Sequence, residues 1–168
     1  MIVLILVLIV IFNFILQTAI FPYISIFGVE PNIALLVVIS MAIFKGRFYG
    51  AFLGLIIGLI QDILFSPVLG VNSFILFFVG YLVGLMENRV IKDNLSLPIF
   101  LSILATIYYN FTYYIFMFFL SKNISFLSFT RDVLLIEILY NCILSIPIYK
   151  IFSKIFVVPK IRFGSKQR

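Results

Sequence analysis

Two acidic side chains lie inside long apolar stretches of this 168-residue chain. Asp62 comes near the end of the apolar run that starts at Phe48, and Glu137 follows shortly after the start of another run at Val133. An ionisable group inside hydrocarbon is costly, so each acid marks a candidate functional position. Two carboxyl groups that lie close together can also act as a general acid and a general base.

Catalysis is the less favoured interpretation of these acids. The chain has no histidine, and no serine–lysine pairing or metal-ligand cluster accompanies the two carboxyl groups. An intramembrane aspartyl protease is expected to carry Gly-x-Gly-Asp, whereas the run Gly58–Gln61 precedes Asp62. We therefore expect no enzymatic activity, no catalytic residue, no metal and no cofactor.

The acids belong to a predicted layer of polar residues at one depth. Asp62 lies three residues before the end of its run and Glu137 four residues after the start of its own, roughly 5–7 Å below the surface at a rise of about 1.5 Å per residue. This outer-leaflet polar cluster consists of Gln17, Asp62, Asn72, Glu137 and Asn141. It either caps loops and contacts interfacial water, or forms a polar cavity or partner-docking site open to the outside.

Glycines four residues apart form a stripe that leads to Asp62. The stripe comprises Gly46, Gly50, Gly54 and Gly58, and a second Gly-x-x-x-Gly pair follows at Gly80 and Gly84. Small residues let helix backbones approach closely in a membrane. The stripe is predicted to pack against the run that carries the second pair, or to receive a helix from another protein.

The geometry of the stripe adds a further expectation. Steps of four advance about 40° beyond a full turn, so the stripe winds about 160° around the helix between Gly46 and Asp62. Its inner and outer halves are therefore expected to contact different helices.

Composition defines the elements that must position these residues. The chain is 64% hydrophobic and 11% charged, which is too apolar for a soluble domain. It is predicted to be an all-α integral membrane protein with a single domain of six transmembrane helices. The predicted spans are about 1–21, 30–44, 48–65, 73–86, 97–120 and 133–152, followed by a basic tail at 153–168. A cleaved signal peptide is the competing interpretation of the first run, which lacks a basic start and is too long.

The distribution of cations predicts the orientation. Ten of the 12 Lys and Arg residues fall on one side of the six predicted spans and two on the other. The first side holds Lys45, Arg47, Arg89, Lys92, Lys150, Lys154, Lys160, Arg162, Lys166 and Arg168, and the second holds Lys122 and Arg131. The positive-inside rule makes the first side, with both termini, cytoplasmic. The basic tail is expected to contact anionic lipid, and nucleic acid is not an expected partner.

The order of these features resembles a known family. Pro31-Asn32 opens an apolar span that ends at a basic turn, and the glycine stripe and Asp62 follow. Pro67-x-Leu69-Gly70-x-Asn72 then precedes the span with Gly80 and Gly84. Over residues 30–86 this arrangement is similar to that of the rod shape-determining protein MreD family.

The resemblance implies a non-enzymatic scaffold of the cell-elongation (rod) complex in the bacterial inner membrane, supporting peptidoglycan synthesis and cell shape. It implies the bitopic protein MreC as a partner, together with MreB, RodA and a class B penicillin-binding protein. It also implies an S-component-like bundle, similar to the substrate-binding subunits of energy-coupling-factor transporters. The family motif falls on Pro31, Asn32, Gly50, Gly54, Gly58, Asp62, Leu69, Gly70 and Asn72, and none of these is implied to be catalytic.

An S-component that takes up a small vitamin is the alternative function. Such a subunit is expected to carry Ala-x-x-x-Ala on its first span, where this chain has only Ala19. Neighbouring cell-shape genes and a copurifying bitopic protein would favour the scaffold, whereas a vitamin pathway and a retained vitamin would favour uptake.

Overall fold

The computed structural model describes residues 2–20, 23, 25, 28–87, 96–120 and 134–156, and within these ranges it contains helices and no β-strand. The helices are α1 (Ile2–Ile15), the short π-helical η1 (Leu16–Ile20), α3 (Ile33–Lys45), α4 (Arg47–Phe65), α5 (Val71–Gly84), α6 (Ser96–Phe119) and α8 (Leu135–Phe156). The prediction of an all-α fold is confirmed. Three helices, α4, α6 and α8, are long and apolar enough to cross a membrane, while α3, α5 and the apolar stretch Leu4–Ala19 are shorter.

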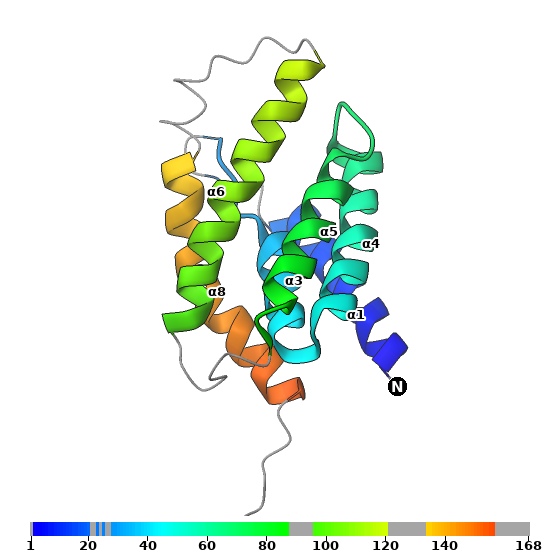
Figure 1. Cartoon of the computed structure of the whole chain (residues 1–168), viewed down its shortest axis with the longest axis vertical. Coiled ribbons are helices and arrows are strands. Elements are labelled where there is room, and N and C mark those ends of the chain that lie inside the picture. Colours follow the sequence, from blue (N-terminus) through cyan, green and yellow to red (C-terminus); the bar gives the residue numbers. More distant parts are fainter. Residues whose placement is uncertain are drawn as a thin grey trace, which may run out of the picture.

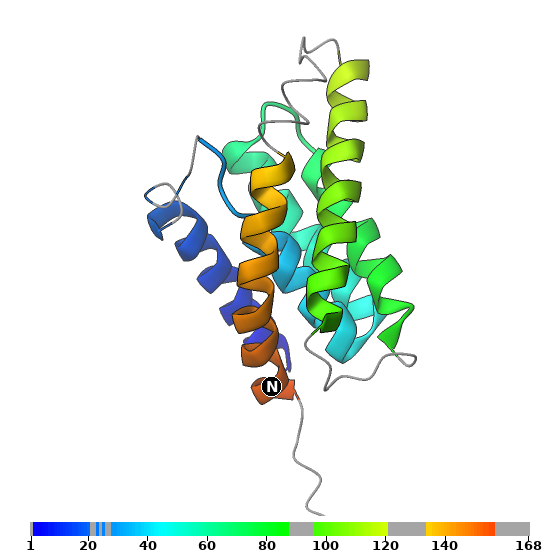
Figure 2. The same ribbon diagram turned by 90° about the vertical axis from the view of Figure 1, so that its left-hand side faces the viewer.

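Successive helices run in alternating directions (Figures 1 and 2). The beginning of α1, the junction between α3 and α4, and the end of α8 lie at one end of the bundle. The α4–α5 turn, the end of α6 and the beginning of α8 lie at the opposite end. The observed helix bounds depart from the predicted spans by a few residues, because capping residues and turns rather than hydrophobicity end each helix.

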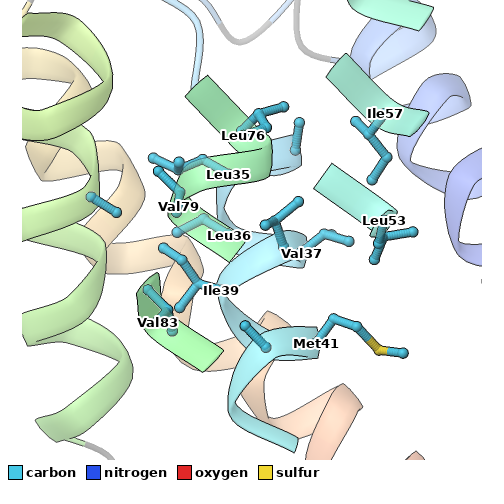
Figure 3. Packing of buried hydrophobic residues seen from close by; sticks show 14 of the residues in the cluster. Leu35, Leu36, Val37, Ile39, Met41, Leu53, Ile57, Leu76, Val79 and Val83 are labelled. Atoms are coloured by element: carbon cyan, nitrogen blue, oxygen red, sulfur yellow. The ribbon is translucent and has the colours of Figure 1, made fainter. Parts of the chain in front are cut away.

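Helix α3 forms the centre of the bundle. Its residues from Ile33 to Phe44 are all buried, and it contacts α1, α4, α5, α6 and α8. Figure 3 shows Leu35, Leu36 and Val37 pointing in different directions from α3 toward its neighbours. A helix that is apolar on every face is stable only when it is surrounded. At 13 residues it is about 20 Å long, shorter than the roughly 30 Å hydrocarbon core of a bilayer.

Helices α4 and α5 pack backbone against backbone. A Cβ atom added to Gly54 would come closer than 3.0 Å to the backbone of Leu76, and one added to Gly58 would do the same to Ser73. Gly50 and Gly80 likewise face each other's backbones, and Gly84 faces the backbone of Arg47. Because α5 occupies this surface, the stripe leaves no room there for a helix from another protein.

The two halves of the stripe share α5 as a neighbour, and only the inner half also contacts α3. A Cβ on Gly50 would meet Ala42 of α3 as well as Gly80 of α5, whereas Gly54 and Gly58 face α5. Asp62 continues the contact with α5 by accepting hydrogen bonds from Asn72 and Ser73. Residues four apart form rows that run obliquely over a helix, so a neighbour crossing at an angle follows the row along its whole length.

Two glycines belong to turns rather than to helix contacts. Gly46 joins α3 to α4 at φ 86°, and Gly70 precedes α5 at φ 97°, a left-handed region that side chains with a Cβ rarely adopt. A Cβ on Gly46 would also collide with the carboxylate of Glu87, beyond the end of α5. Gly46 is therefore the junction residue at the start of α4, and the contact stripe begins at Gly50.

We predict that Gly54→Ala destabilises the protein by about 1–3 kcal/mol, the usual cost of overpacking. This reverses the ordinary preference for alanine over glycine in helices, which is about 1 kcal/mol. Thermal unfolding in detergent measures the change, with Phe52→Ala on the exposed face of α4 as the control. A Gly54→Ala protein as stable as the parent would contradict the close packing.

Candidate functional site

The beginning of α3 lies among buried polar side chains. Asn32 caps the helix by accepting a hydrogen bond from the backbone N–H of Leu35 at 3.1 Å. The backbone N–H of Asn32 donates in turn to Oδ1 of Asn141 on α8 at 3.0 Å. The first N–H groups of a helix have no intrahelical partner, and inside an apolar bundle water cannot supply one. Asn32 and Asn141 supply these partners from side chains.

The network continues through α6 to the buried acid. Asn141 Nδ2 donates to Thr106 Oγ1 at 2.9 Å, and Thr106 Oγ1 donates to the backbone carbonyl of Ser102 at 2.7 Å. One turn along α6, Asn110 Nδ2 donates to the carbonyl of Thr106 at 3.0 Å and to Oε2 of Glu137 at 2.7 Å. Glu137 is 6% exposed, so its carboxyl group is held inside the bundle by a neutral amide.

Asp62 caps the beginning of α5 from the facing helix. Its two carboxylate oxygens accept hydrogen bonds from the backbone N–H groups of Asn72 and Ser73, both at 2.9 Å, and from the Ser73 hydroxyl at 2.5 Å. Asn72 Oδ1 accepts a hydrogen bond from the Tyr109 hydroxyl. A negative charge at a helix N-terminus is favourable, so Asp62 has a clear role in holding the α4–α5 hairpin together.

A cavity of about 310 Å³ lies above the beginning of α3. The side chains that line it come from five helical elements and include Gln17 of η1, Gln61 and Phe65 of α4, Asn72 of α5, Tyr109, Asn110 and Tyr113 of α6, and Glu137 of α8. The segment Gly28–Asn32 lines it as well. The cavity exists because α3 starts well below the α4–α5 turn, leaving the end of the bundle without a central helix (Figure 1).

The structure brings most of the predicted polar cluster to this cavity. Gln17, Asn72 and Glu137 line it. Asp62 and Asn141 lie outside the lining, and each hydrogen-bonds to a residue that belongs to it. Both interpretations of the cluster therefore apply to different members, since Asp62 caps a helix while the other polar groups surround a cavity.

Residues of the family motif take structural positions around the cavity. Pro31 and Asn32 line it at the beginning of α3. Gly70 provides the left-handed turn before α5, and Leu69 is exposed in that turn.

Several functional side chains were not predicted. Gln61 was passed over, although its Nε2 donates to Gln17 Oε1 at 3.0 Å. On α6, the sequence prediction did not include Ser102, Thr106 and Asn110. These residues recur at a spacing of four and are all buried. That spacing places them on one face of the helix, a signal that identifies the polar face of α6 from the sequence.

The lining of the cavity is acidic and rich in acceptors. Within the described part of the chain, the lining includes the carboxyl groups of Glu30 and Glu137 and no lysine or arginine. No group of three metal-ligating side chains occurs among the described residues. The predicted basic tail lies outside the described ranges from residue 157 onward, as do Lys122 and Arg131.

A second, apolar groove of about 480 Å³ lies between α1 and α8 over the side of α3. Its lining includes Leu8 and Phe12 of α1, Val37 of α3 and Ile151 of α8. Figure 2 shows α1 diverging from α8. Among the described residues that line the groove, the single polar side chain is that of Asn13. It is 3% exposed, and its Oδ1 has no hydrogen-bond partner.

We predict that Asp62→Asn lowers the stability of the protein by about 1–3 kcal/mol. One oxygen that accepts hydrogen bonds becomes an NH₂ donor facing other donors, and buried N–H groups lose their partner. Ser73→Ala is the matched control, because it removes only one of the three hydrogen bonds and is expected to cost about 1 kcal/mol. Equal unfolding temperatures for Asp62→Asn and the parent would exclude the capping role.

Comparison with known proteins agrees with the resemblance noted in the sequence. The family model described as rod shape-determining protein MreD matches residues 1–155. A search of curated proteins finds no match, and a search of solved structures finds none either, so the S-component-like fold stays a prediction. The family match covers nearly the whole chain and includes every helix described above except the last residue of α8. This chain therefore belongs to the MreD family of rod shape-determining proteins.

Proposed function

We propose that this protein is a non-enzymatic scaffold of the cell-elongation complex (the elongasome), which binds MreC and supports peptidoglycan synthesis. The observation that carries the proposal is the family match over residues 1–155, since membership implies a role in rod shape determination. The buried polar groups support it, because Asp62, Asn141 and Asn32 are engaged in capping helices and holding the bundle together. MreB, RodA and a class B penicillin-binding protein are the wider partners we propose.

We further propose that all six helices span the bacterial inner membrane with both termini in the cytoplasm. The alternation of helix direction supports this orientation. The four cations among the described residues support it as well, because Lys45 and Arg47 lie at the α3–α4 junction and Lys150 and Lys154 lie near the end of α8. The short helix α3 fits such an arrangement, because its neighbours surround it and the cavity takes up the missing length. The basic tail at 153–168 would then contact anionic lipid.

The orientation predicts the behaviour of reporter fusions. Green fluorescent protein fused after Arg168 is expected to fluoresce, and alkaline phosphatase fused there is expected to be inactive, because the first reporter matures in the cytoplasm and the second outside it. An alkaline phosphatase fused within the α4–α5 turn, after Val68, serves as the opposite control and should be active. Activity of the phosphatase after Arg168 would invert the proposed topology.

We propose that the transmembrane helix of MreC docks in the apolar groove between α1 and α8. The glycine stripe is filled by α5, so a partner helix needs another surface. The groove is open to the surroundings, since Leu8 and Phe12 on one side and Ile151 on the other are about half exposed. Its volume of about 480 Å³ is the largest among the cavities described here.

The unpartnered amide of Asn13 supports docking at this groove. An amide oxygen without a partner is costly in hydrocarbon, and a serine, threonine or asparagine on a neighbouring helix supplies the missing hydrogen bond. Such bonds between membrane helices are worth about 0.6–1.7 kcal/mol. Asn13 would then set the register of the partner helix, and the apolar walls would supply the packing.

Cysteine cross-linking to MreC tests this assignment. Cys142 is first replaced by serine, and single cysteines are placed at Leu8 and Ile151 in the groove. Matched controls are placed at Phe111 and Phe118, which are similarly exposed on α6 and do not line the groove. Cross-links are expected at the groove positions only, and Asn13→Leu is expected to reduce MreC copurification about threefold to twentyfold.

The outcomes separate two possible errors. If MreC copurifies with the parent protein but cross-links only to α6, the groove is the wrong docking surface and the scaffold function stands. If MreC fails to copurify with the parent protein, the proposed partner is wrong.

A further inference from the structure

The polar cavity above α3 has features that the scaffold function does not use. Its volume of about 310 Å³ is at the lower end of the range for small-molecule sites, about 300–1,000 Å³. Its lining includes the buried carboxyl group of Glu137, five amide side chains and two tyrosines. Helix capping accounts for Asp62 and Asn141, whereas Glu137 and Gln61 cap no helix and line the cavity.

The first observation is an acceptor without a donor. Gln61 is 7% exposed, and its Oε1 has no hydrogen-bond partner although the residue lines the cavity. Its Nε2 donates a hydrogen bond to Gln17 Oε1. One polar atom of the Gln61 amide is therefore bonded, and the other has no partner. A buried acceptor of this kind costs about 1–3 kcal/mol, and an N–H donor that comes within hydrogen-bond distance of Oε1 would recover this energy.

The second observation is a carboxyl group without a cation. Glu137 is 6% exposed and accepts a hydrogen bond from the neutral amide of Asn110 at 2.7 Å. Among the described residues the cavity lining offers no lysine or arginine, and Glu30 adds a second acid at the exposed rim. Buried charges in proteins are ordinarily paired, so the lining has the composition of a site that receives a positive charge.

The third observation is the aromatic wall. Tyr109 and Tyr113 line the cavity with their rings stacked 6.2 Å apart at 7°. Aromatic faces attract cations, most strongly where water is excluded. Acceptors that require N–H donors, combined with a carboxyl group and aromatic rings, match an ammonium group with three donors and do not match an anion or a neutral hydrocarbon.

We propose that this cavity binds a small ligand bearing a primary ammonium group, supplied either by the head group of an aminophospholipid or by a free amine. Glu137 provides the countercharge, Gln61 Oε1 accepts an N–H bond, and the tyrosine pair covers the cation. The site is independent of the MreC groove, which lies between α1 and α8 and shares none of the residues named here.

Soluble probes test the chemistry on the full chain in phosphatidylglycerol nanodiscs. Ethanolamine, choline and glycerol are compared at matched ionic strength by their effect on the unfolding temperature, because a ligand stabilises the folded protein that binds it. A rise with ethanolamine that exceeds those with choline and glycerol supports a free-amine site, since choline lacks N–H donors and glycerol lacks charge. Equal effects of the three probes would exclude a free amine as the ligand.

A lipid arm distinguishes the second source. Native mass spectrometry of the chain released from nanodiscs with equal phosphatidylethanolamine and phosphatidylglycerol counts the lipid that stays bound. Preferential retention of phosphatidylethanolamine supports a head-group site even if ethanolamine alone has no effect. If neither ethanolamine nor phosphatidylethanolamine is preferred, the cavity is not an ammonium site.

Variants assign the effect to the cavity. Glu137→Gln is expected to weaken binding at least about tenfold, because a charge-assisted hydrogen bond is lost. Glu87→Gln, at the opposite end of the bundle beside Gly46, removes the same charge and is expected to leave the ligand-induced shift unchanged. If Glu137→Gln fails to fold, Tyr113→Leu replaces it, because Tyr113 is only partly buried. Unchanged binding in the folded cavity variant would overturn the proposal.

Discussion

The burial of a short helix is the constraint on which the rest of the structure depends. Helix α3 is apolar on every face and is surrounded by five helices, yet it extends only about 20 Å. Its first N–H groups consequently lie inside the bundle, where other groups of the protein must satisfy them. The N–H of Ile33 donates to the carbonyl of Pro31. Asn32 and Asn141 accept hydrogen bonds there through their side chains. Thr106, Asn110 and Glu137 complete the network that those amides require.

The α4–α5 hairpin solves a related problem by different means. Glycines on both helices bring the backbones into contact, which provides packing where the hydrophobic effect does not favour one apolar neighbour over another. Asp62 on α4 then accepts hydrogen bonds from the first N–H groups of α5. The buried carboxylate and the glycine stripe therefore both hold α4 against α5. The cavity lies between the capped beginning of α3 and the capped beginning of α5.

The distribution of roles among the acids follows from this arrangement. Asp62 has three hydrogen-bond donors and no remaining task, whereas Glu137 is held by a neutral amide beside a cavity. Two carboxyl groups at the same predicted depth therefore differ in their surroundings, because Asp62 caps a helix terminus and Glu137 lines a cavity.

The sequence by itself determined the approximate helix positions, the family and five of the polar residues in or beside the cavity. Hydrophobic runs, glycine spacing and acids within apolar runs are local signals. Only the tertiary structure decided which helix each residue faces. The stripe was expected to divide between two neighbours, whereas in the structure α5 follows it from Gly50 to Gly58 and α3 adds a contact at Gly50 alone. Likewise, only the structure shows that the row of Ser102, Thr106 and Asn110 belongs to the hydrogen-bond network at the buried beginning of α3. A polar side chain in an apolar run shows that a partner is needed, but its identity depends on contacts between residues distant in the chain.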